Sequence, residues 1–131
     1  MSYLVDSDWM IDGLSGRRRT LAFLEEHRDE GLGVSLVSLG ELYEGAYGSP
    51  EPEAHLVSLE RFLALFTVVP LSDETMQHFG RLRALLRQQG NLIPDLDLLI
   101  AATALEHDLV LLTRNRRHFK RIPGIQLSET A

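Results

Sequence analysis

Three carboxylates that lie far apart in the sequence stand next to predicted strands. Asp6 comes directly after the apolar run YLV, at the end of the first predicted strand. Glu41 lies near the start of the helix after the second strand, and Asp97 lies in the first turn of the helix before the fourth. Strands separated by helices pair in parallel, so their carboxyl ends meet at one edge of the sheet. We therefore expect Asp6, Glu41 and Asp97 to lie close together.

The chemistry that explains three converging carboxylates best is the binding of a divalent cation. Two carboxylates about 4 Å apart repel by roughly 4 kcal/mol at an effective dielectric constant of 20. Helix capping and helix-dipole effects contribute only about 1 kcal/mol each, so they explain such a cluster poorly. Mg²⁺ and Mn²⁺ prefer oxygen ligands and also coordinate phosphate oxygens. The sequence therefore predicts a cation site in which Asp6, Glu41 and Asp97 are catalytic.

Each acidic residue near this edge also has a purely structural interpretation. The stretch Ser38-Leu39-Gly40-Glu41 fits the S-x-x-E capping box, in which Glu41 would only cap a helix. Asp97 can favour the dipole of its helix, and Asp8 can be a turn residue. Asp95 is interpreted as a helix N-cap, because residues two apart do not share a helix face.

The elements that position these residues alternate between strand and helix. This order predicts an α/β fold, a three-layer α/β/α sandwich with a central, mostly parallel sheet of four or five strands. Predicted strands cover residues 3–6, 33–37, 66–71 and 109–112, with a short fifth strand at 125–127. Predicted helices cover residues 18–29, 38–47, 53–65 and 72–89, and a buried helix begins near Pro94 and includes 98–105. A short helix or turn follows the first strand.

The composition limits the class of protein. A chain of 131 residues predicts a single domain, 1–131. There is no cysteine, which excludes disulfides and thiolate metal sites. No apolar run approaches the roughly 20 residues of a membrane span, and no basic segment precedes an apolar one at the N-terminus. These features predict a cytoplasmic protein with no membrane partner.

Charge is unevenly distributed along the chain, whose net charge is -6. Residues 1–113 carry 18 acidic and 8 basic residues, a balance of -10, whereas residues 114–131 carry 1 and 5, a balance of +4. The basic residues lie in the stretch TRNRRHFKR. A local basic patch can hold a phosphate chain near an acidic centre, although an ordinary solvated surface explains the stretch equally well.

Four blocks together resemble a PIN domain, most closely a VapC-type toxin ribonuclease. They are YLVDSDWMI, VSLVSLGELYEG, PDLDLLIAATALEHDLVLLT and TRNRRHFKRIPG, which span almost the whole chain in the family's order. The resemblance implies RNA cleavage that depends on Mg²⁺ or Mn²⁺, with products that carry 5′-phosphate and 3′-hydroxyl ends. It also implies a PIN-like parallel sheet between helices, a homodimer and a cognate VapB-type antitoxin that blocks the site.

By position in the motifs, Asp6, Glu41 and Asp97 match the family's first three acidic ligands. The chain departs at the fourth, where many relatives have Asp and this sequence has Asn115. An amide oxygen can ligate a metal but adds no charge, so Asn115 or Asp8 is the candidate for the fourth position, and the number of metal ions stays open. The remaining candidates are hydroxyls beside the ligands and arginines that contact the RNA backbone: Ser7, Thr113, Arg114, Arg116 and Arg117.

Three alternatives remain at the level of the sequence. Asp6-Ser7-Asp8 after a strand resembles the haloacid-dehalogenase-type phosphatases, but the remote Lys that they need has only Lys120 as a candidate. A response-regulator receiver would leave Glu41 and Asp97 without roles. A degenerate PIN domain that only binds RNA or protein is the third, and the three retained carboxylates argue against it.

The apolar side chains provide a further argument for the homodimer. Trp9, Leu63, Phe66 and Phe79 are large residues in a small domain, and they are predicted to exceed what its core can bury. A surplus of this kind would be covered by a second copy of the chain.

Overall fold

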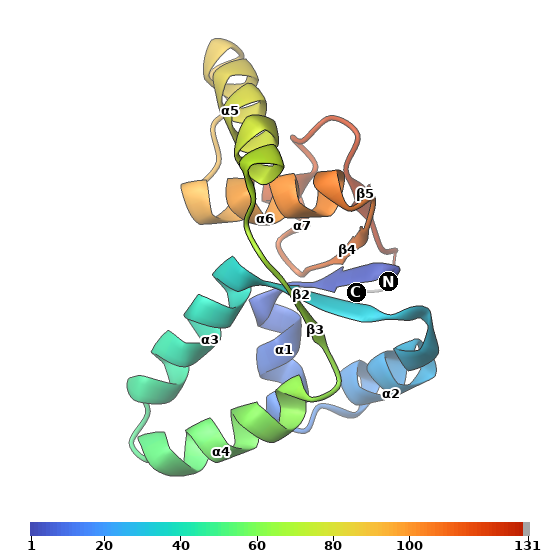
Figure 1. The fold of residues 1–131 in the computed structure, drawn as a ribbon, viewed down its shortest axis with the longest axis vertical. Helices are drawn as coiled ribbons and strands as arrows, with labels where there is room; N and C mark the ends of the chain where they lie inside the picture. The colour runs from blue at the N-terminus through green and yellow to red at the C-terminus, as the bar shows by residue number, and fades with distance from the viewer. Residues whose placement is uncertain (130–131) are drawn as a thin grey trace.

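Five parallel strands form one central sheet (Figure 1). The computed structural model describes residues 1–129. In chain order the strands are β1 (Tyr3–Val5), β2 (Leu32–Ser35), β3 (Thr67–Val69), β4 (Val110–Leu112) and β5 (Gln126–Leu127). Their spatial order is β3-β2-β1-β4-β5, and every neighbouring pair is parallel. The predicted parallel sheet is therefore confirmed, including its short fifth strand.

Helices cover both faces of this sheet, as predicted for a three-layer sandwich. In chain order they are α1 (Ser7–Leu14), α2 (Arg18–Glu26), the short 3-10 helix η1 (Arg28–Glu30), α3 (Leu36–Tyr47), α4 (Pro52–Leu63), α5 (Asp73–Gln88), α6 (Asp95–Glu106) and α7 (Arg116–Phe119). In Figure 1, α5, α6 and α7 lie above the sheet, whereas α1, α2, α3 and α4 lie below it. The chain moves to the other side of β1 when it reaches β4, so the order of strands reverses between these two neighbours.

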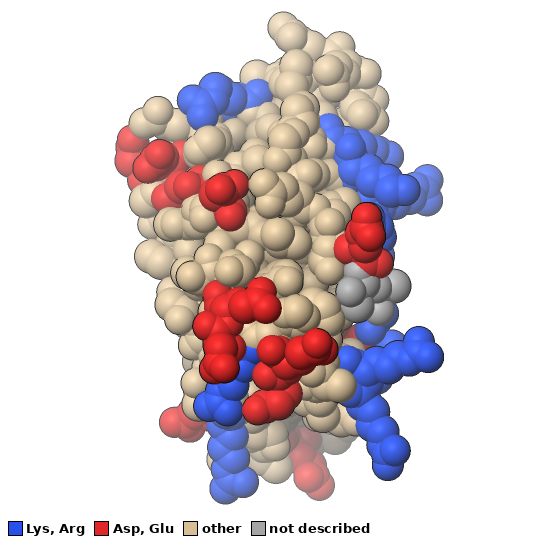
Figure 2. All heavy atoms as spheres, turned by 90° about the vertical axis from the view of Figure 1, so that its right-hand side faces the viewer, with Lys and Arg blue, Asp and Glu red and all other residues tan. Residues whose placement is uncertain are grey.

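Most charged side chains lie on the outside of these layers. On the face that corresponds to the right-hand side of Figure 1, acidic and basic side chains are interspersed (Figure 2). On this face, the uneven charge of the sequence does not become a continuous basic surface.

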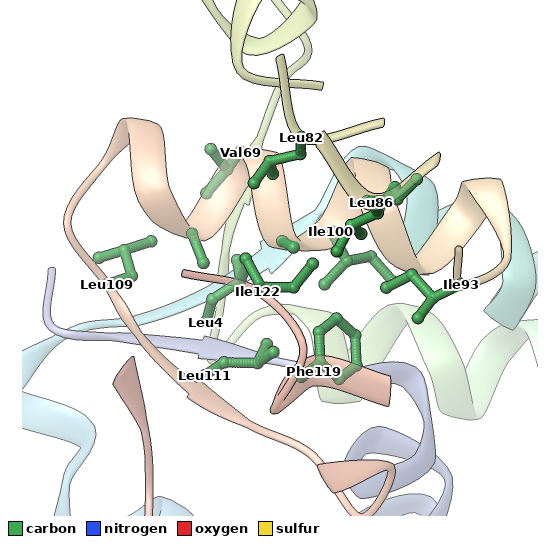
Figure 3. Close-up of a cluster of buried hydrophobic side chains, with 13 residues drawn as sticks. Leu4, Val69, Leu82, Leu86, Ile93, Ile100, Leu109, Leu111, Phe119 and Ile122 are labelled. Carbon is green, nitrogen blue, oxygen red and sulfur yellow. The ribbon is translucent and has the colours of Figure 1, made fainter. Parts of the chain in front are cut away.

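Two apolar clusters hold the layers together, one on each face of the sheet. Successive side chains of a strand point to opposite faces, so Leu4 joins the cluster under α5 and α6 and Val5 joins the one over α1–α4. Leu111 and Leu112 of β4 divide in the same way. Figure 3 shows Leu4 and Leu111 beneath Ile100 of α6. The predicted burial of the helix that follows Pro94 is confirmed, because Leu98 to Ala104 are buried except for Leu99.

The helix that carries Glu41 begins earlier than predicted. The strand before it is Leu32–Ser35, and Ser35 is the N-cap, whose side chain accepts a hydrogen bond from the Ser38 backbone N–H. The proposed capping box of Ser38 and Glu41 is therefore wrong, and Glu41 lies in the second turn of α3. Ser38, Leu42 and Ala46 of α3 are buried and follow one another at intervals of four residues, so they share one face of the helix. Burial of this face fixes the rotation of α3 about its axis.

The expectation for Asp95 is corrected by packing, whereas the expected surplus of apolar residues falls on other residues than those named. Asp95 is not an N-cap, since Pro94 occupies that position and the Asp95 carboxylate pairs with the Arg83 side chain at 3.0 Å. Of the apolar residues named as surplus, Trp9 is 1% exposed, and Leu63, Phe66 and Phe79 are partly buried against the two clusters. Other large apolar side chains are exposed, among them Tyr47, Val57 and Leu96. The expected surplus therefore lies mainly at other residues, and the homodimer stays a prediction.

Of the helices within residues 1–129, none combines the length and apolarity needed to cross a membrane.

Candidate active site

The first predicted site residue lies at the point where the strand order reverses, between β1 and β4. The Asp6 backbone N–H donates to the Leu112 carbonyl at 2.9 Å, so the two strands end side by side. The Asp6 side chain caps α1, because its Oδ1 accepts from the Ser7 backbone N–H at 2.7 Å. Its Oδ2 accepts from the Thr113 hydroxyl at 2.7 Å. Ligand sites in doubly wound sheets form at this kind of position.

Glu41 reaches the same place from α3. The hydroxyl of Ser7 donates to Glu41 Oε1 at 3.1 Å, which joins the start of α1 to the second turn of α3. This bond occupies one carboxylate oxygen. Within residues 1–129, the other oxygen, Oε2, accepts no hydrogen bond.

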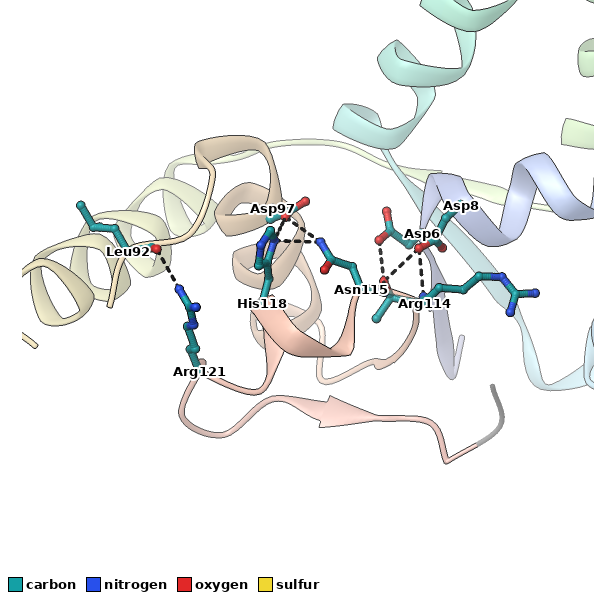
Figure 4. A network of polar contacts seen from close by, with 9 residues as sticks. Asp6, Asp8, Leu92, Asp97, Arg114, Asn115, His118 and Arg121 are labelled. Carbon is teal, nitrogen blue, oxygen red and sulfur yellow. Dashed lines mark hydrogen bonds and ion pairs between the residues drawn. The ribbon is translucent and has the colours of Figure 1, made fainter. Parts of the chain in front are cut away.

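Asp97 enters from the opposite layer, at the first turn of α6. Its Oδ2 accepts from the Asn115 side-chain amide at 3.1 Å and lies 2.8 Å from His118 Nδ1. Figure 4 shows these three side chains meeting beside the Asp6 and Asp8 carboxylates. As in Glu41, one oxygen is held and the other, Oδ1, accepts no hydrogen bond from the described part of the chain.

One hydrogen-bonded network connects all seven candidate ligands and hydroxyls. Thr113 is its centre, because its hydroxyl contacts both Asp6 and Asp8, the latter at 3.4 Å, and accepts from the Asn115 backbone N–H at 3.0 Å. Asn115 continues the network to Asp97. The structure thus gathers the predicted residues at one edge of the sheet, while their chemical roles stay predictions.

The electrostatics of this cluster disfavour negative charge. Burial and, second, the charge of Asp8 raise the pKa of Asp6 from 3.8 to about 7, although hydrogen bonds from Thr113 and Ser7 act in the opposite direction. Burial also raises the pKa of Asp8, against hydrogen bonds from the Arg114 and Trp9 backbone N–H groups. For Glu41, burial is again the largest cause of a raised pKa, followed by the charges of Asp97 and Asp8.

The donor set fits a hard divalent cation. The pKa values of the Asp6, Asp8 and Glu41 carboxyl groups are raised, and both Glu41 and Asp97 keep one oxygen free of hydrogen bonds from the described residues. Such a set is what Mg²⁺ or Mn²⁺ prefers. The carboxylates do not form a closed cage, since residues 1–129 contain no group of three His, Asp or Glu side chains close enough to enclose a metal ion. Repulsion between like charges favours such an open arrangement.

Two of the three arginines predicted to contact RNA have partners within the chain. The guanidinium of Arg114 pairs with Asp12 and lies 5.6 Å from the centre of the Trp9 ring. Arg116 donates to the Ser128 carbonyl. Arg117 is exposed on α7. Of the three, Arg117 is therefore the one whose side chain is placed best for an external phosphate.

Comparison with known proteins places this arrangement in a family. A model of the PIN domain matches residues 3–125. The chain belongs to the PIN-domain family. The predicted family is thereby confirmed, and the site described above lies at the edge of this PIN domain's sheet.

The relatives of this PIN domain are VapC ribonucleases. "Ribonuclease VapC2" of Haemophilus influenzae is 33% identical over 128 residues, which are 96% of each chain. The "tRNA(fMet)-specific endonuclease VapC" of Salmonella typhimurium is 35% identical over 96 residues, which are 73% of each chain. Within the family, this PIN domain therefore belongs with the VapC ribonucleases.

Solved structures confirm the fold. A chain of VapBC2 from Rickettsia felis, solved with a DNA fragment from its promoter, superimposes with a TM-score of 0.93 at 28% identity, covering 98% of both chains. A chain of DNA-bound VapBC from Salmonella typhimurium gives a TM-score of 0.92 at 28% identity and covers 98% of this chain and 97% of its own.

The PIN domain also places near the site two residues that the sequence analysis did not identify. His118 contacts Asp97, and Asp12 holds Arg114. The signal for His118 was present, because Asn115 and His118 are three residues apart and residues at this spacing share a helix face. No comparable signal pointed to Asp12, whose contact with Arg114 joins residues about one hundred positions apart.

A pocket adjoins the site on the side of α1 and α3. It has a volume of about 260 Å³ and is lined by Glu41 and by apolar residues that include Ile11, Leu14 and Leu42. A segment that filled this pocket would lie directly against the Glu41 side chain.

Proposed function

We propose that this chain is the endoribonuclease toxin of a VapBC-type toxin–antitoxin module, which hydrolyses RNA phosphodiester bonds with Mg²⁺ or Mn²⁺. The observation that carries the proposal is the joining of Asp6, Glu41 and Asp97 in one network at the edge of the sheet. Because the chain belongs with the VapC ribonucleases, we infer that the reaction at this network is RNA cleavage. The proposed products carry 5′-phosphate and 3′-hydroxyl ends.

The proposed mechanism assigns different tasks to the side chains. Asp6, Glu41 and Asp97 would hold the cation, which when bound acidifies water and stabilises charge on the scissile phosphate. Ser7 and Thr113 hold one oxygen each of Glu41 and Asp6, so these carboxylates keep their direction. Glu41 is half-buried, and its Oε2 accepts no hydrogen bond from residues 1–129, so this is the oxygen that would face the cation.

The proposed partners follow from the relatives and the pocket. The similar solved chains come from VapBC complexes, and we propose a VapB-type antitoxin as the protein partner of this chain. The pocket beside Glu41 supports this, because a partner seated there would block the site. We also propose a homodimer and a cytoplasmic location. The cytoplasmic location fits an RNA substrate and a chain without cysteine.

A binding-only PIN domain is the second candidate. It is favoured by Asn115, whose amide nitrogen faces Asp97 instead of adding a fourth carboxylate. A metal-dependent cleavage assay separates the two candidates, because a binding-only domain needs no cation to hold RNA.

Cation dependence is expected in both stability and activity. The chain should be co-expressed with its genomic neighbour, purified away from it and melted with chelator or with Mn²⁺. Mn²⁺ at about one hundred times its dissociation constant is expected to stabilise the fold by about 2.7 kcal/mol, or roughly 10 °C in melting temperature. Structured RNAs should be cleaved with Mn²⁺ or Mg²⁺ and not with chelator. RNA binding without cleavage under any of these conditions would favour the second candidate.

Arg117 is expected to contribute one phosphate contact. Arg117→Ala should weaken RNA binding and reduce the slope of log affinity against log salt by about 0.7, because one fewer counterion is released. Fluorescence anisotropy with labelled RNA measures both, in an Asp97→Asn background that does not cleave. Arg87→Ala, an exposed arginine at the end of α5, is the matched control. Equal slopes for the two variants would mean that Arg117 belongs to an ordinary solvated surface.

A further inference from the structure

His118 is the only basic side chain that contacts Asp6, Glu41 or Asp97 within residues 1–129. Its Nδ1 lies 2.8 Å from Asp97 Oδ2 and 2.8 Å from the Asn115 side-chain nitrogen (Figure 4). Nδ1 carries either a hydrogen or a lone pair, so it can donate to Asp97 or accept from Asn115, but not both. A lone pair would face a carboxylate oxygen, so the geometry favours a hydrogen on Nδ1.

Both donors therefore meet the same oxygen of Asp97. Asn115 and His118 direct their hydrogens to Oδ2, which fixes the rotation of the carboxylate and leaves Oδ1 free of hydrogen bonds from the described residues. Side chains that hold a ligand carboxylate in this way commonly tune metal affinity. Ser7 holds Glu41 in the same manner, through one oxygen.

The backbone that carries the His118 imidazole is anchored by its neighbours in the sequence. Phe119, the next residue, is fully buried in the cluster under α6, and Ile122 beyond it is 2% exposed. Arg121 donates to the Leu92 carbonyl at 3.0 Å, which ties the end of this segment to the loop before α6 (Figure 4). These contacts hold the backbone segment that carries His118 beside the first turn of α6.

We propose that His118 is a positioning residue for the divalent cation: its Nδ1–H, together with the Asn115 amide, orients Asp97 so that Oδ1 faces the ion. The inference rests on the proposed function, because it assigns a task within that cation site. His118 touches neither the ion nor the RNA in this assignment. Its effect reaches the reaction only through the direction of Asp97.

The chain offers a matched control for this role. His27 Nδ1 lies 2.8 Å from Glu30 Oε1, again an imidazole nitrogen and a carboxylate oxygen at the same distance, at the end of α2 and away from the site. The His27 ring also packs against Tyr3 and Phe23, with ring centres 5.2 Å and 4.2 Å apart, so its loss can lower stability without reaching the cation site. Only the pair at His118 should affect the cation.

The test measures Mn²⁺ binding directly, by titration calorimetry on the purified full chain without RNA. His118→Ala is expected to weaken Mn²⁺ binding by about 10–100-fold. His118→Asn, whose amide N–H can take the place of Nδ1–H, should stay within a few-fold of the parent, and His27→Ala should bind like the parent. Melting temperatures in chelator should be similar for the parent and the two His118 variants. Cleavage by His118→Ala should return to near the parental rate once Mn²⁺ saturates it.

Several outcomes would overturn the proposal. Parental Mn²⁺ affinity in His118→Ala would exclude a positioning role, and equal losses in His118→Ala and His118→Asn would show that the N–H donor is not what matters. A large fall in melting temperature in chelator would make His118 a structural residue. If the parent chain itself bound no Mn²⁺, the proposed function would fail together with this inference, whereas the other outcomes leave that function intact.

Discussion

Asp97→Asn is expected to reduce RNA cleavage by more than about 100-fold and to remove most of the melting-temperature increase that Mn²⁺ produces. Loss of a residue that only supports a ligand already lowers affinity or activity by about 10–100-fold, so loss of the ligand's charge should exceed that. The substitution nearly keeps the shape of the side chain. Its amide oxygen can still accept from Asn115 and His118, so the fold of the α6 N-terminus should persist.

Asp95→Asn is the matched control, in the first turn of the same helix. Asp95 faces Arg83 on the outside of the molecule and has no contact with the network. Its cleavage rate and its response to Mn²⁺ should equal those of the parent. Initial cleavage rates and thermal melts of the two variants can be measured side by side. Similar losses in both would indicate that the start of α6, and not the Asp97 carboxylate, is what the activity requires.

Asp6→Asn is expected to make the cation-free protein more stable at high pH while it abolishes cleavage. The folded-state pKa of Asp6 is raised from 3.8 to about 7, so the fold favours the protonated carboxyl. The stability that this gives is fully present below about pH 4 and is lost as pH rises to about 7. Each pKa unit corresponds to about 1.4 kcal/mol, so the loss is at most roughly 4 kcal/mol. An asparagine carries no charge, so the Asp6→Asn variant avoids this loss of stability at high pH.

Urea unfolding in chelator at pH 5 and pH 8 tests this expectation. Asp6→Asn should exceed the parent in free energy of unfolding at pH 8 by about 2–4 kcal/mol, and by clearly less at pH 5. The variant loses part of the hydrogen bonding that the Asp6 carboxylate accepts from Thr113 and Ser7. This loss reduces the gain in free energy of unfolding by about 1 kcal/mol at both pH values. Asp29→Asn, an exposed aspartate in η1, should show no such difference. A gain at Asp6 that is the same at both pH values would mean that its charge is not the cause.

Much of the fold could be predicted from the sequence because the relevant signals are local. Short apolar runs such as 109–112 are buried on both faces of a parallel sheet, and their composition shows it. Gly31 and Gly90 mark the ends of helical segments and have positive φ values of 93° and 65°, which glycine adopts without strain. Asp6 was placed correctly for the same reason, since a carboxylate directly after a buried strand must lie at its carboxyl end.

Helix starts were the weaker part of the prediction, because several residues compete for the N-cap. Ser35 and Ser38 both fit the cap of α3 and both are fully buried, but Ser35 ends β2 with an extended backbone and pairs with Val69 of β3, so it is the cap. Asp95 fits a cap from its residue type, but Arg83 of the neighbouring helix draws its carboxylate outward. Local preferences of about 1 kcal/mol are easily reversed by such tertiary contacts.

The sequence by itself determined which residues can supply oxygen ligands and that the order of strands and helices brings Asp6, Glu41 and Asp97 to one edge. Only the tertiary structure decided what surrounds them. Asn115 faces Asp97 with its amide, His118 completes that contact, and Arg114 is paired with Asp12. These contacts depend on how the segment after β4 packs against α1 and α6. Side chains from distant segments meet there, and no periodicity in the sequence predicts such contacts.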